Sequence, residues 1–573
     1  MPSITVFKRA ICRIFSRNQK GLIMLKAEYV FRRPPLTLAV IACAMLMTQA
    51  PSAAAFELNF GEDSELSGNL DMTLGYAASW RTQDADSSDL VPGYLARGLN
   101  YTADARDPDA GDLLTNIAKA TAELDLGWRN YGLVASVTYQ YDHEVMRSGN
   151  AVDVFTGESR DSSEAAEDYA GNFVDVHDVY VYGTFDVGEN ANPLEVRIGK
   201  QVINWGEGLF FVNGVATQAP LNFNKLTTPG SELKEAYIGN EAVYAQLGIG
   251  DESALEVYSQ WRWNRTELPP MDTFFGSEAL GRGGDELTSF GIPARPSDIE
   301  ADDSGQWGLA FRTNVGNVEY GLYYSRYHET LPLLGVDQSD PGNFDPVICG
   351  GFPCNSVFGL SQIWAEDQDM FGVSASGTLG LWSINAELAY RPDQALWGDL
   401  FAKGYTNLNP GDDFLTNVER HDTLHASLHG VWLGRGIDAL GIDNQVGLLQ
   451  FGVDYIEGDL DNLAVHSTIT RNEDLTTLSP DSTAYGIAGE WIATWNQVLP
   501  GVDFELDLFL QHDIKGNSHW WGNFAEGRTI GSLGLDAIIR QDLVVGLTYA
   551  WINQGNSDYE DQDTLNLSVN YKF

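Results

Sequence analysis

The body of the chain lacks any long apolar run, and this absence excludes the commonest kind of membrane protein. A helix that crosses a bilayer needs about 20 consecutive apolar residues, and no such run follows residue 55. Only helices and closed sheets satisfy every backbone group in lipid. If the mature chain lies in a membrane, it must therefore be a β-barrel.

Basic residues are also scarce. The chain has 34 Lys and Arg against 80 Asp and Glu, a net charge of −46. Residues 1–55 hold eight of the basic residues and one acidic residue, so the remainder carries −53. This excess excludes nucleic acid as a partner and argues against peripheral docking on anionic lipid. It is typical of solvated acidic loops, which divalent cations can bridge to lipopolysaccharide.

Cysteine is nearly absent, with four in 573 residues. Cys349 and Cys354 enclose Gly-Gly-Phe-Pro, and in an exported protein this spacing predicts a local disulfide. Neither His nor a second Cys pair stands nearby, so a metal site is not expected there. No other metal site and no cofactor is predicted.

The apolar run that does occur spans residues 36–50, after two arginines and before three small residues. This pattern predicts a signal peptide over residues 1–55, cleaved before Phe56. Met24 would give a leader of more ordinary length and is an alternative start. A run ending at Cys43 resembles a lipoprotein cleavage box, but the apolar segment continues past it.

The last ten residues alternate without a fault. Apolar residues stand at every odd position from Leu565 to Phe573, with polar residues between them. Alternation with period two predicts a strand with one apolar face. Its ending on Tyr571 and Phe573 resembles the signal by which the barrel-assembly machinery recognises outer-membrane barrels. We expect this segment to close such a barrel.

Seventeen earlier segments alternate in the same way, which predicts an all-β fold: a single large antiparallel transmembrane β-barrel of about 18 strands (16–18) over residues 56–573. The even count places both ends of the barrel in the periplasm, with short periplasmic turns and long external loops. Residues 433–443 are expected to be a longer periplasmic turn. The strands are expected near 70–80, 118–128, 131–141, 174–187, 194–203, 237–249, 254–264, 305–313, 318–328, 369–379, 381–391, 422–432, 444–456, 483–497, 502–514, 528–539, 542–552 and 564–573.

Aromatic residues near the expected strand ends predict girdles at the two membrane interfaces, with ordinary packing as the alternative for each. These residues are Trp128, Tyr139, Trp261, Trp263, Trp432, Trp491, Trp551 and Tyr571.

Three internal motifs are the most specific part of the sequence: Arg197-Ile-Gly-Lys-Gln201, Trp205-Gly-Glu207 and Pro229-Gly-Ser-Glu-Leu-Lys-Glu235. With the Phe-ending strand, they resemble the DUF1302 family of Gram-negative outer-membrane proteins over essentially the whole mature chain. The resemblance implies a barrel in the cell outer membrane and members that handle hydrophobic compounds such as sterols or fatty acids. It supplies no catalytic residues.

Residues 204–236 are expected to be the third external loop, yet they are too apolar for a loop in water. We expect this loop to fold into the lumen as a constriction or plug; the alternative is that it packs on the rim with its charges paired locally. The apolar residues are Leu209, Phe210, Phe211, Val212, Val215, Leu221, Phe223 and Leu226. Trp205 and the charged residues Glu207, Lys225, Glu232, Lys234 and Glu235 would then face Glu195, Arg197 and Gln201 of the wall.

These features predict a channel for passive uptake of small, mainly hydrophobic compounds. A general cation-preferring porin is the alternative, and a structural protein or a hydrolase using His512 with Asp513 or His519 is a further one, although no Gly-x-Ser-x-Gly motif accompanies Trp205. We expect no enzymatic activity. The expected partners are outer-membrane lipid and lipopolysaccharide, the barrel-assembly machinery, a small-molecule substrate and a periplasmic or inner-membrane transport partner.

Overall fold

A computed structural model describes most of the region after the predicted leader. The predicted signal peptide and the Cys349–Cys354 pair lie outside the described residues, so both stay predictions. No helix among the described residues is long and apolar enough to cross a membrane. The described residues are 56–58, 60, 64–84, 108–152, 159–216, 219–276, 281–283, 288–289, 292–293, 298–337, 359–398, 414–416, 418–461, 463, 479–520, 523–553 and 562–573.

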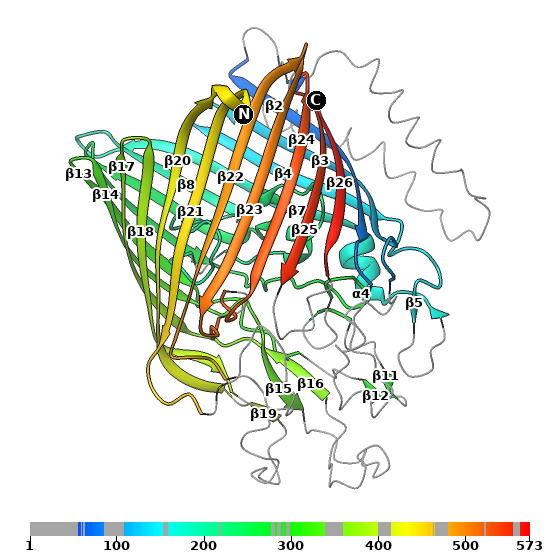
Figure 1. The fold of residues 1–573 in the computed structure, drawn as a ribbon. Helices are drawn as coiled ribbons and strands as arrows, with labels where there is room; N and C mark the ends of the chain where they lie inside the picture. The colour runs from blue at the N-terminus through cyan, green and yellow to red at the C-terminus, as the bar shows by residue number, and fades with distance from the viewer. Residues whose placement is uncertain are drawn as a thin grey trace. The chain divides into compact units, whose positions relative to one another are not determined.

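Eighteen antiparallel strands of this described part form one closed sheet (Figure 1). Each strand pairs with the next barrel strand in sequence, and the first also pairs with the last. The predicted fold is therefore confirmed. The strands are β2 (Leu66–Arg81), β3 (Leu113–Trp128), β4 (Tyr131–Asp142), β7 (Asn172–Val187), β8 (Asn192–Gln201), β9 (Asn240–Ile249), β10 (Ser253–Gln260), β13 (Trp307–Val315), β14 (Val318–Tyr327), β17 (Gln368–Leu379), β18 (Trp382–Trp397), β20 (Val418–Ile437), β21 (Ile442–Ile456), β22 (Thr483–Leu499), β23 (Val502–Lys515), β24 (Thr529–Ile539), β25 (Leu543–Asn553) and β26 (Thr564–Lys572).

The C-terminal strand closes the ring. β26 pairs with β2 from Thr73 opposite Lys572 to Arg81 opposite Thr564. Beyond the strand, Met72 and Phe573 exchange two backbone hydrogen bonds of 2.9 Å each. The last residue of the chain is thus part of the closure.

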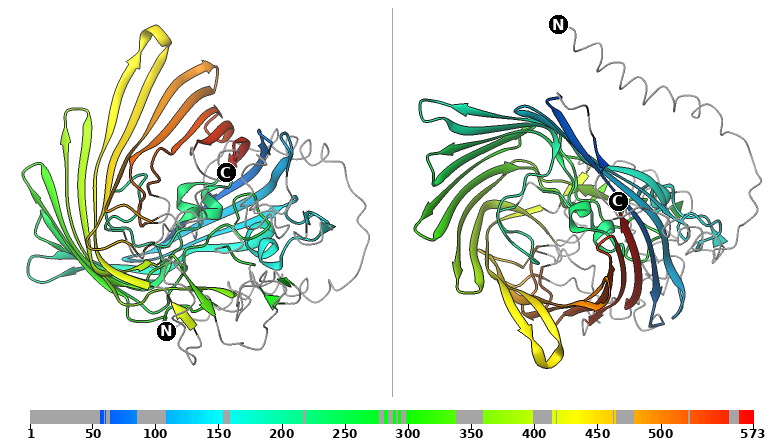
Figure 2. Two further views of the ribbon diagram at one scale, coloured as in Figure 1. Left: turned by 60° about the horizontal axis from the view of Figure 1, so that its bottom comes forward. Right: turned by 90° about the horizontal axis from the view of Figure 1, so that it is seen from above.

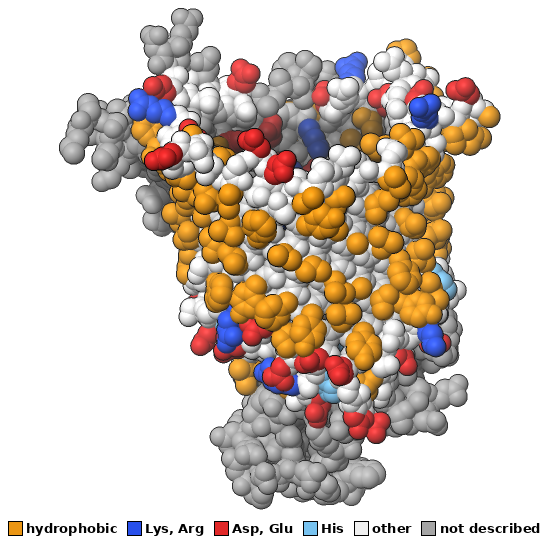
Figure 3. Space-filling model, turned by 90° about the vertical axis from the view of Figure 1, so that its left-hand side faces the viewer, with side chains coloured by type: hydrophobic (Ala, Val, Ile, Leu, Met, Phe, Trp, Pro, Cys, Tyr) orange, Lys and Arg blue, Asp and Glu red, His pale blue; other side chains and the backbone are white. Residues whose placement is uncertain are grey.

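The two faces of the wall differ as the alternation predicts. On β18, Leu388 and Tyr390 are exposed on the outside, whereas Glu387 and Ala389 are buried. On the side of the barrel that Figure 3 shows, apolar side chains cover the middle of the outer surface, and charged side chains gather near its two edges. A slip of one residue would turn the charged set towards lipid, where a mid-depth basic residue costs roughly 2 to 4 kcal/mol. The alternation therefore fixes the register.

Aromatic pairs stack across neighbouring strands near the strand ends. The ring centroids of Trp128 and Tyr131 lie 6.0 Å apart, and those of Trp382 and Trp432 lie 6.3 Å apart. Trp263 follows the alternative of ordinary packing: its side chain is buried against Trp364 and Ala301 beyond the end of β10.

The short turns lie at one end of the barrel. Gly380 between β17 and β18 has a φ of 63°, a conformation that glycine adopts without a steric penalty. The prediction of a longer turn at 433–443 is wrong. β20 continues to Ile437 and β21 begins at Ile442, and the two strands are joined by the single turn η4 (Asp438–Leu440).

Shorter elements accompany the eighteen barrel strands. Of these, β1 extends the barrel sheet by pairing with β2, and the small sheets β11–β12 and β16–β15–β19 lie at the end opposite the short turns (Figure 1). α5 and α6 belong to the segment between β8 and β9, inside the ring of strands (Figure 2). These elements are β1 (Phe56–Glu57), β5 (Ala151–Val152), β6 (Ser159–Arg160), α4 (Glu164–Ala166), η2 (Glu167–Gly171), α5 (Phe223–Leu226), α6 (Leu233–Ala236), β11 (Thr288–Ser289), β12 (Ile292–Pro293), β15 (Leu333–Asp337), β16 (Gly359–Ile363) and β19 (Phe414–Thr416).

Candidate functional site: the inward loop

The segment between β8 and β9, residues 202–239, is called the inward loop below. Its second half is closed by backbone hydrogen bonds from Asn222 to Ala236 (2.7 Å) and from Ile238 to Pro220 (2.9 Å). The Asn222 side chain caps α5 by accepting from the backbone of Lys225. Glu232 and Glu235 form a capping box on α6, which satisfies backbone donors at a helix start. The loop is therefore an ordered structure of its own.

Glycines of two motifs allow the loop to approach the wall closely. Gly206 has a φ of 83°, and a Cβ there would lie 2.8 Å from Glu387 Oε1. Gly230 has a φ of 69°, and its Cβ would lie 2.9 Å from Ser568 on β26. Both positions combine a left-handed backbone with no room for a side chain. This explains the Trp-Gly-Glu and Pro-Gly motifs physically.

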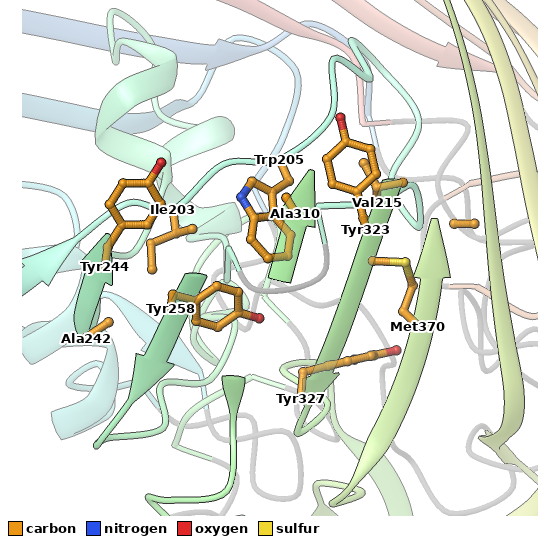
Figure 4. Close-up of a cluster of buried hydrophobic side chains, with 11 residues drawn as sticks. Ile203, Trp205, Val215, Ala242, Tyr244, Tyr258, Ala310, Tyr323, Tyr327 and Met370 are labelled. Carbon is orange, nitrogen blue, oxygen red and sulfur yellow. The ribbon is translucent and has the colours of Figure 1, made fainter. Parts of the chain in front are cut away.

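Trp205 fixes the first part of the loop to one side of the wall. Its indole is fully buried and donates to Glu256 Oε2 at 3.0 Å. Tyr258 of β10 and Tyr323 of β14 flank it at centroid distances of 5.0 and 6.0 Å (Figure 4). A buried aromatic ring with its N–H satisfied is a strong attachment.

The tip of the loop hydrogen-bonds to strands farther round the ring. The side-chain oxygen of Gln450 on β21 accepts from the backbone N–H groups of residues 209, 210 and 211 at 3.0, 2.6 and 3.3 Å. Arg391 of β18 donates to the carbonyls of Asn213 (2.8 Å) and Gly214 (2.6 Å). Glu387 accepts from the backbone of Glu207. Inward side chains of the wall thus satisfy the backbone of the loop.

Apolar contacts reinforce this attachment. Phe211 packs on Phe524 and Phe210 on Phe509, with centroids 4.8 and 5.3 Å apart. Val212 exchanges two hydrogen bonds of 3.0 Å with the side chain of Asn523. The apolar residues that suggested an inward loop therefore largely pack against the wall.

The second part of the loop returns to β3 and β4 with buried charges. Glu235 pairs with Lys119 of β3 at 2.7 Å and accepts from Thr121 at 3.1 Å. Burial alone would raise the pKa of Glu235, but Lys119 outweighs it and holds this pKa below its usual range. Lys225 is fully buried, donates to Gln140 of β4 at 2.9 Å, and has its pKa lowered by burial to about 8.

A more exposed ion network lies beside this pair. Lys234 contacts Glu123 of β3 at 2.8 Å and Glu232 at 3.0 Å. Lys572 of β26 contacts Glu232 at 2.8 Å. Burial lowers the pKa of Lys234, but its two carboxylate partners raise it above its usual range overall. The loop therefore contacts β10, β14, β18 and β21 with its first part and β3, β4 and β26 with its second.

The predicted wall residues of β8 have other contacts. Arg197 pairs with Glu195 and lies over the rings of Tyr180 and Tyr244. Gln201 is buried and donates to the carbonyl of Ala242 at 3.0 Å. Within the described part of the chain, the ion pairs between charged loop residues and the wall reach β3 and β26 and not β8. The side chain of Glu207 is exposed.

Sequence reasoning missed the wall residues that hold the loop: Glu256, Glu387, Arg391, Gln450 and Asn523. Each of the four on strands occupies an inward position, where a polar residue is expected in any barrel. No spacing in the sequence distinguishes them, because their common partner is the inward loop, which contacts them only in the folded barrel. Their one visible signal was a polar residue on a strand face.

Carboxylates also oppose each other on the inner face of the wall. Asp71 lies opposite Glu123 on β2 and β3, and Glu123 is also the partner of Lys234 of the loop. Glu505 lies opposite Asp536 on β23 and β24. Exposed leucines such as Leu535 alternate with them, so these carboxylates point inward. Paired like charges favour the presence of cations.

The groups considered for hydrolysis have structural partners. Asp513 pairs with Arg528 at 2.6 Å. His512 bonds to Thr529 at 3.0 Å, and burial lowers the pKa of His519 to about 4.

Comparison with protein families gives one match. The family described as "Protein of unknown function (DUF1302)" matches residues 35–573. No curated protein matches the chain.

Comparison with solved structures gives matches of fold. OccAB1 of Acinetobacter baumannii is 9% identical with a TM-score of 0.41, over 91% of this chain and 99% of that one. The outer-membrane channel DcaP of the same organism is 10% identical with a TM-score of 0.36, over 91% and 100%. OpdK of Pseudomonas aeruginosa, solved with vanillate, is 11% identical with a TM-score of 0.39, over 90% and 100%. Such distant likenesses carry no argument about substrate.

Proposed function

The chain belongs to the DUF1302 family, and we propose that it is a channel of the Gram-negative outer membrane that small molecules cross passively and selectively. One observation carries this proposal. The inward loop leaves the wall after Gln201 and contacts strands on several sides of the ring before it returns at Asn240. A loop held in this way narrows the path through a barrel of this size.

We propose that the preferred substrates are small and mainly apolar, as the family resemblance implies. One feature of the loop supports this. Leu226 and Leu233 keep 45% and 62% of their surface exposed within the barrel. An apolar solute would lose unfavourable contact with water at these surfaces.

A cation-preferring porin is the second candidate. The opposed carboxylates Glu505 and Asp536 favour it, because carboxylates that line a pore select cations.

A paired measurement tests the channel and separates the two candidates. Purified protein is placed in planar bilayers under a potassium chloride gradient and, in parallel, in liposomes that receive a small apolar solute or a quaternary ammonium ion. Selective entry of the apolar solute with little steady conductance supports the first candidate. Steady conductance with a cation-selective reversal potential supports the second. Absence of both solute entry and conductance contradicts the proposal that the protein is a channel.

A further inference from the structure

One strand of the wall extends beyond its neighbour. β7 begins at Asn172, and β4 covers one of its edges from there onwards. On the other edge, β8 pairs with β7 only between Val187 and Val179. No strand in the described part of the chain pairs with the β8-facing edge of residues 172–178. The gap arises because the chain turns from β8 into the inward loop.

The end of β8 and the start of the inward loop contact this edge at residues 176–178. The Lys200 ammonium of β8 donates to the carbonyl of Val176 at 2.5 Å, and the backbone of Val202 donates to the side chain of Asp178 at 3.2 Å. Beside the first residues of β7 lies a cavity of about 760 Å³, which Phe173, Val174 and Asp175 border.

The inside of this cavity is polar. Charged side chains from the wall and the β10–β13 connection line it, including Lys200, Arg262, Glu267, Arg282 and Asp303. Its outer rim is apolar, since Val174 and Trp261 keep 64% and 47% of their surface exposed. Val174 stands on the outward face of β7, where Val181 lies lower down the same strand.

An uncovered sheet edge cannot face hydrocarbon, because its backbone groups would have no partner there. It is tolerated where it lines a cavity that holds water. A polar cavity of this size has room for many waters. The edge of β7 therefore borders water on its inner side and lipid-facing apolar residues on its outer side.

We propose that this gap is a lateral portal through which amphipathic small molecules pass between the cavity and the outer leaflet of the membrane. The apolar body of such a molecule contacts Val174 and Trp261 at the rim, while its polar group enters the charged cavity. This inference deepens the proposed channel function and rests on it. It assigns the route by which molecules with an apolar body enter or leave.

The state of the edge is measured directly with a nitroxide at Val174→Cys in proteoliposomes. Val181→Cys is the matched control, because Val181 is on the same face of the same strand and is covered by β4 and β8 on both sides. We expect the nitroxide at position 174 to collide frequently with both oxygen, which dissolves in lipid, and a water-soluble nickel chelate. The nitroxide at position 181 should collide frequently with oxygen alone. Shielding of position 174 from the chelate overturns the portal, whether lipid or a strand of a second copy covers the edge.

The passage of amphipathic molecules is measured with dansyl-undecanoate. Val174→Trp narrows the rim, and Val181→Trp adds the same bulk to the sealed part of the wall. The ratio of dansyl-undecanoate entry to potassium conductance is expected to fall several-fold in Val174→Trp and to stay unchanged in Val181→Trp. An unchanged ratio in Val174→Trp overturns the portal, whereas absence of all flux in the parent protein contradicts the channel itself.

Discussion

Replacing Glu235 with Gln is expected to release the second part of the inward loop from the wall. Glu235 and Lys119 lie 2.7 Å apart with side-chain exposures of 4% and 6%. The substitution keeps the size of the side chain and removes its charge. Lys119 then stays buried with a hydrogen bond to the carbonyl of Gly230 but without its charged partner.

Breaking one side of a buried ion pair costs about 3 kcal/mol or more. Since each 1.36 kcal/mol is a factor of ten, the population with this part of the loop detached should rise roughly a hundredfold. Lys234→Gln is the control, because Lys234 is half exposed and such pairs contribute at most about 1 kcal/mol. Its effect should stay below about tenfold.

Hydrogen exchange of the peptide covering residues 219–239, followed by mass spectrometry, measures this population in detergent or nanodiscs. Glu235→Gln should accelerate exchange far more than Lys234→Gln. The double variant Lys119→Met with Glu235→Leu should recover most of the protection, because it removes both buried charges. Equal exchange in Glu235→Gln and the parent protein would refute the view that this pair fastens the loop.

Three further outcomes follow from single contacts. Burial lowers the pKa of Lys225 to about 8 from an ordinary 10.5, so the closed loop favours the neutral amine. Closure of the loop should therefore strengthen as pH rises from about 8 towards 10.5. In Lys225→Met, loop closure measured by hydrogen exchange should lose this pH dependence. Gly206→Ala should detach the loop tip and speed exchange of residues 205–216, whereas Gly250→Ala, also at positive φ but with open space around it, should leave it unchanged. Deleting Phe573 removes two hydrogen bonds to Met72 and should lower the yield of assembled barrel on heat-modifiable gel electrophoresis, which Phe573→Tyr should preserve.

The barrel could be predicted because each strand carries its own evidence. The alternation in segments such as 502–514 fixes which side chains face lipid, and the turns and parity fix the direction of each strand. The sequence could not settle positions whose surroundings depend on the path of the chain outside the strands. Trp263 has the composition of a girdle residue, yet the chain has left the wall at that point and packs it against Trp364.

The inward loop could be located but its contacts could not be derived. The apolar content of residues 209–226 indicated burial, and the structure attaches Phe211 to Phe524 and Trp205 to Glu256. Charge alone gave no partner for Glu235, because Lys119 is 116 residues away in sequence. Such pairs are set by which strands the loop passes, and that path is a property of the closed barrel.

Single-channel conductance of a variant lacking residues 209–226 decides whether the inward loop controls passage. These residues include the tip held by Gln450 and the α5 helix with Lys225, while all barrel strands remain. We expect a folded barrel whose conductance is much larger than that of the parent protein and whose solute selectivity is reduced. A folded variant with the parent conductance and selectivity would contradict the claim that the inward loop controls passage.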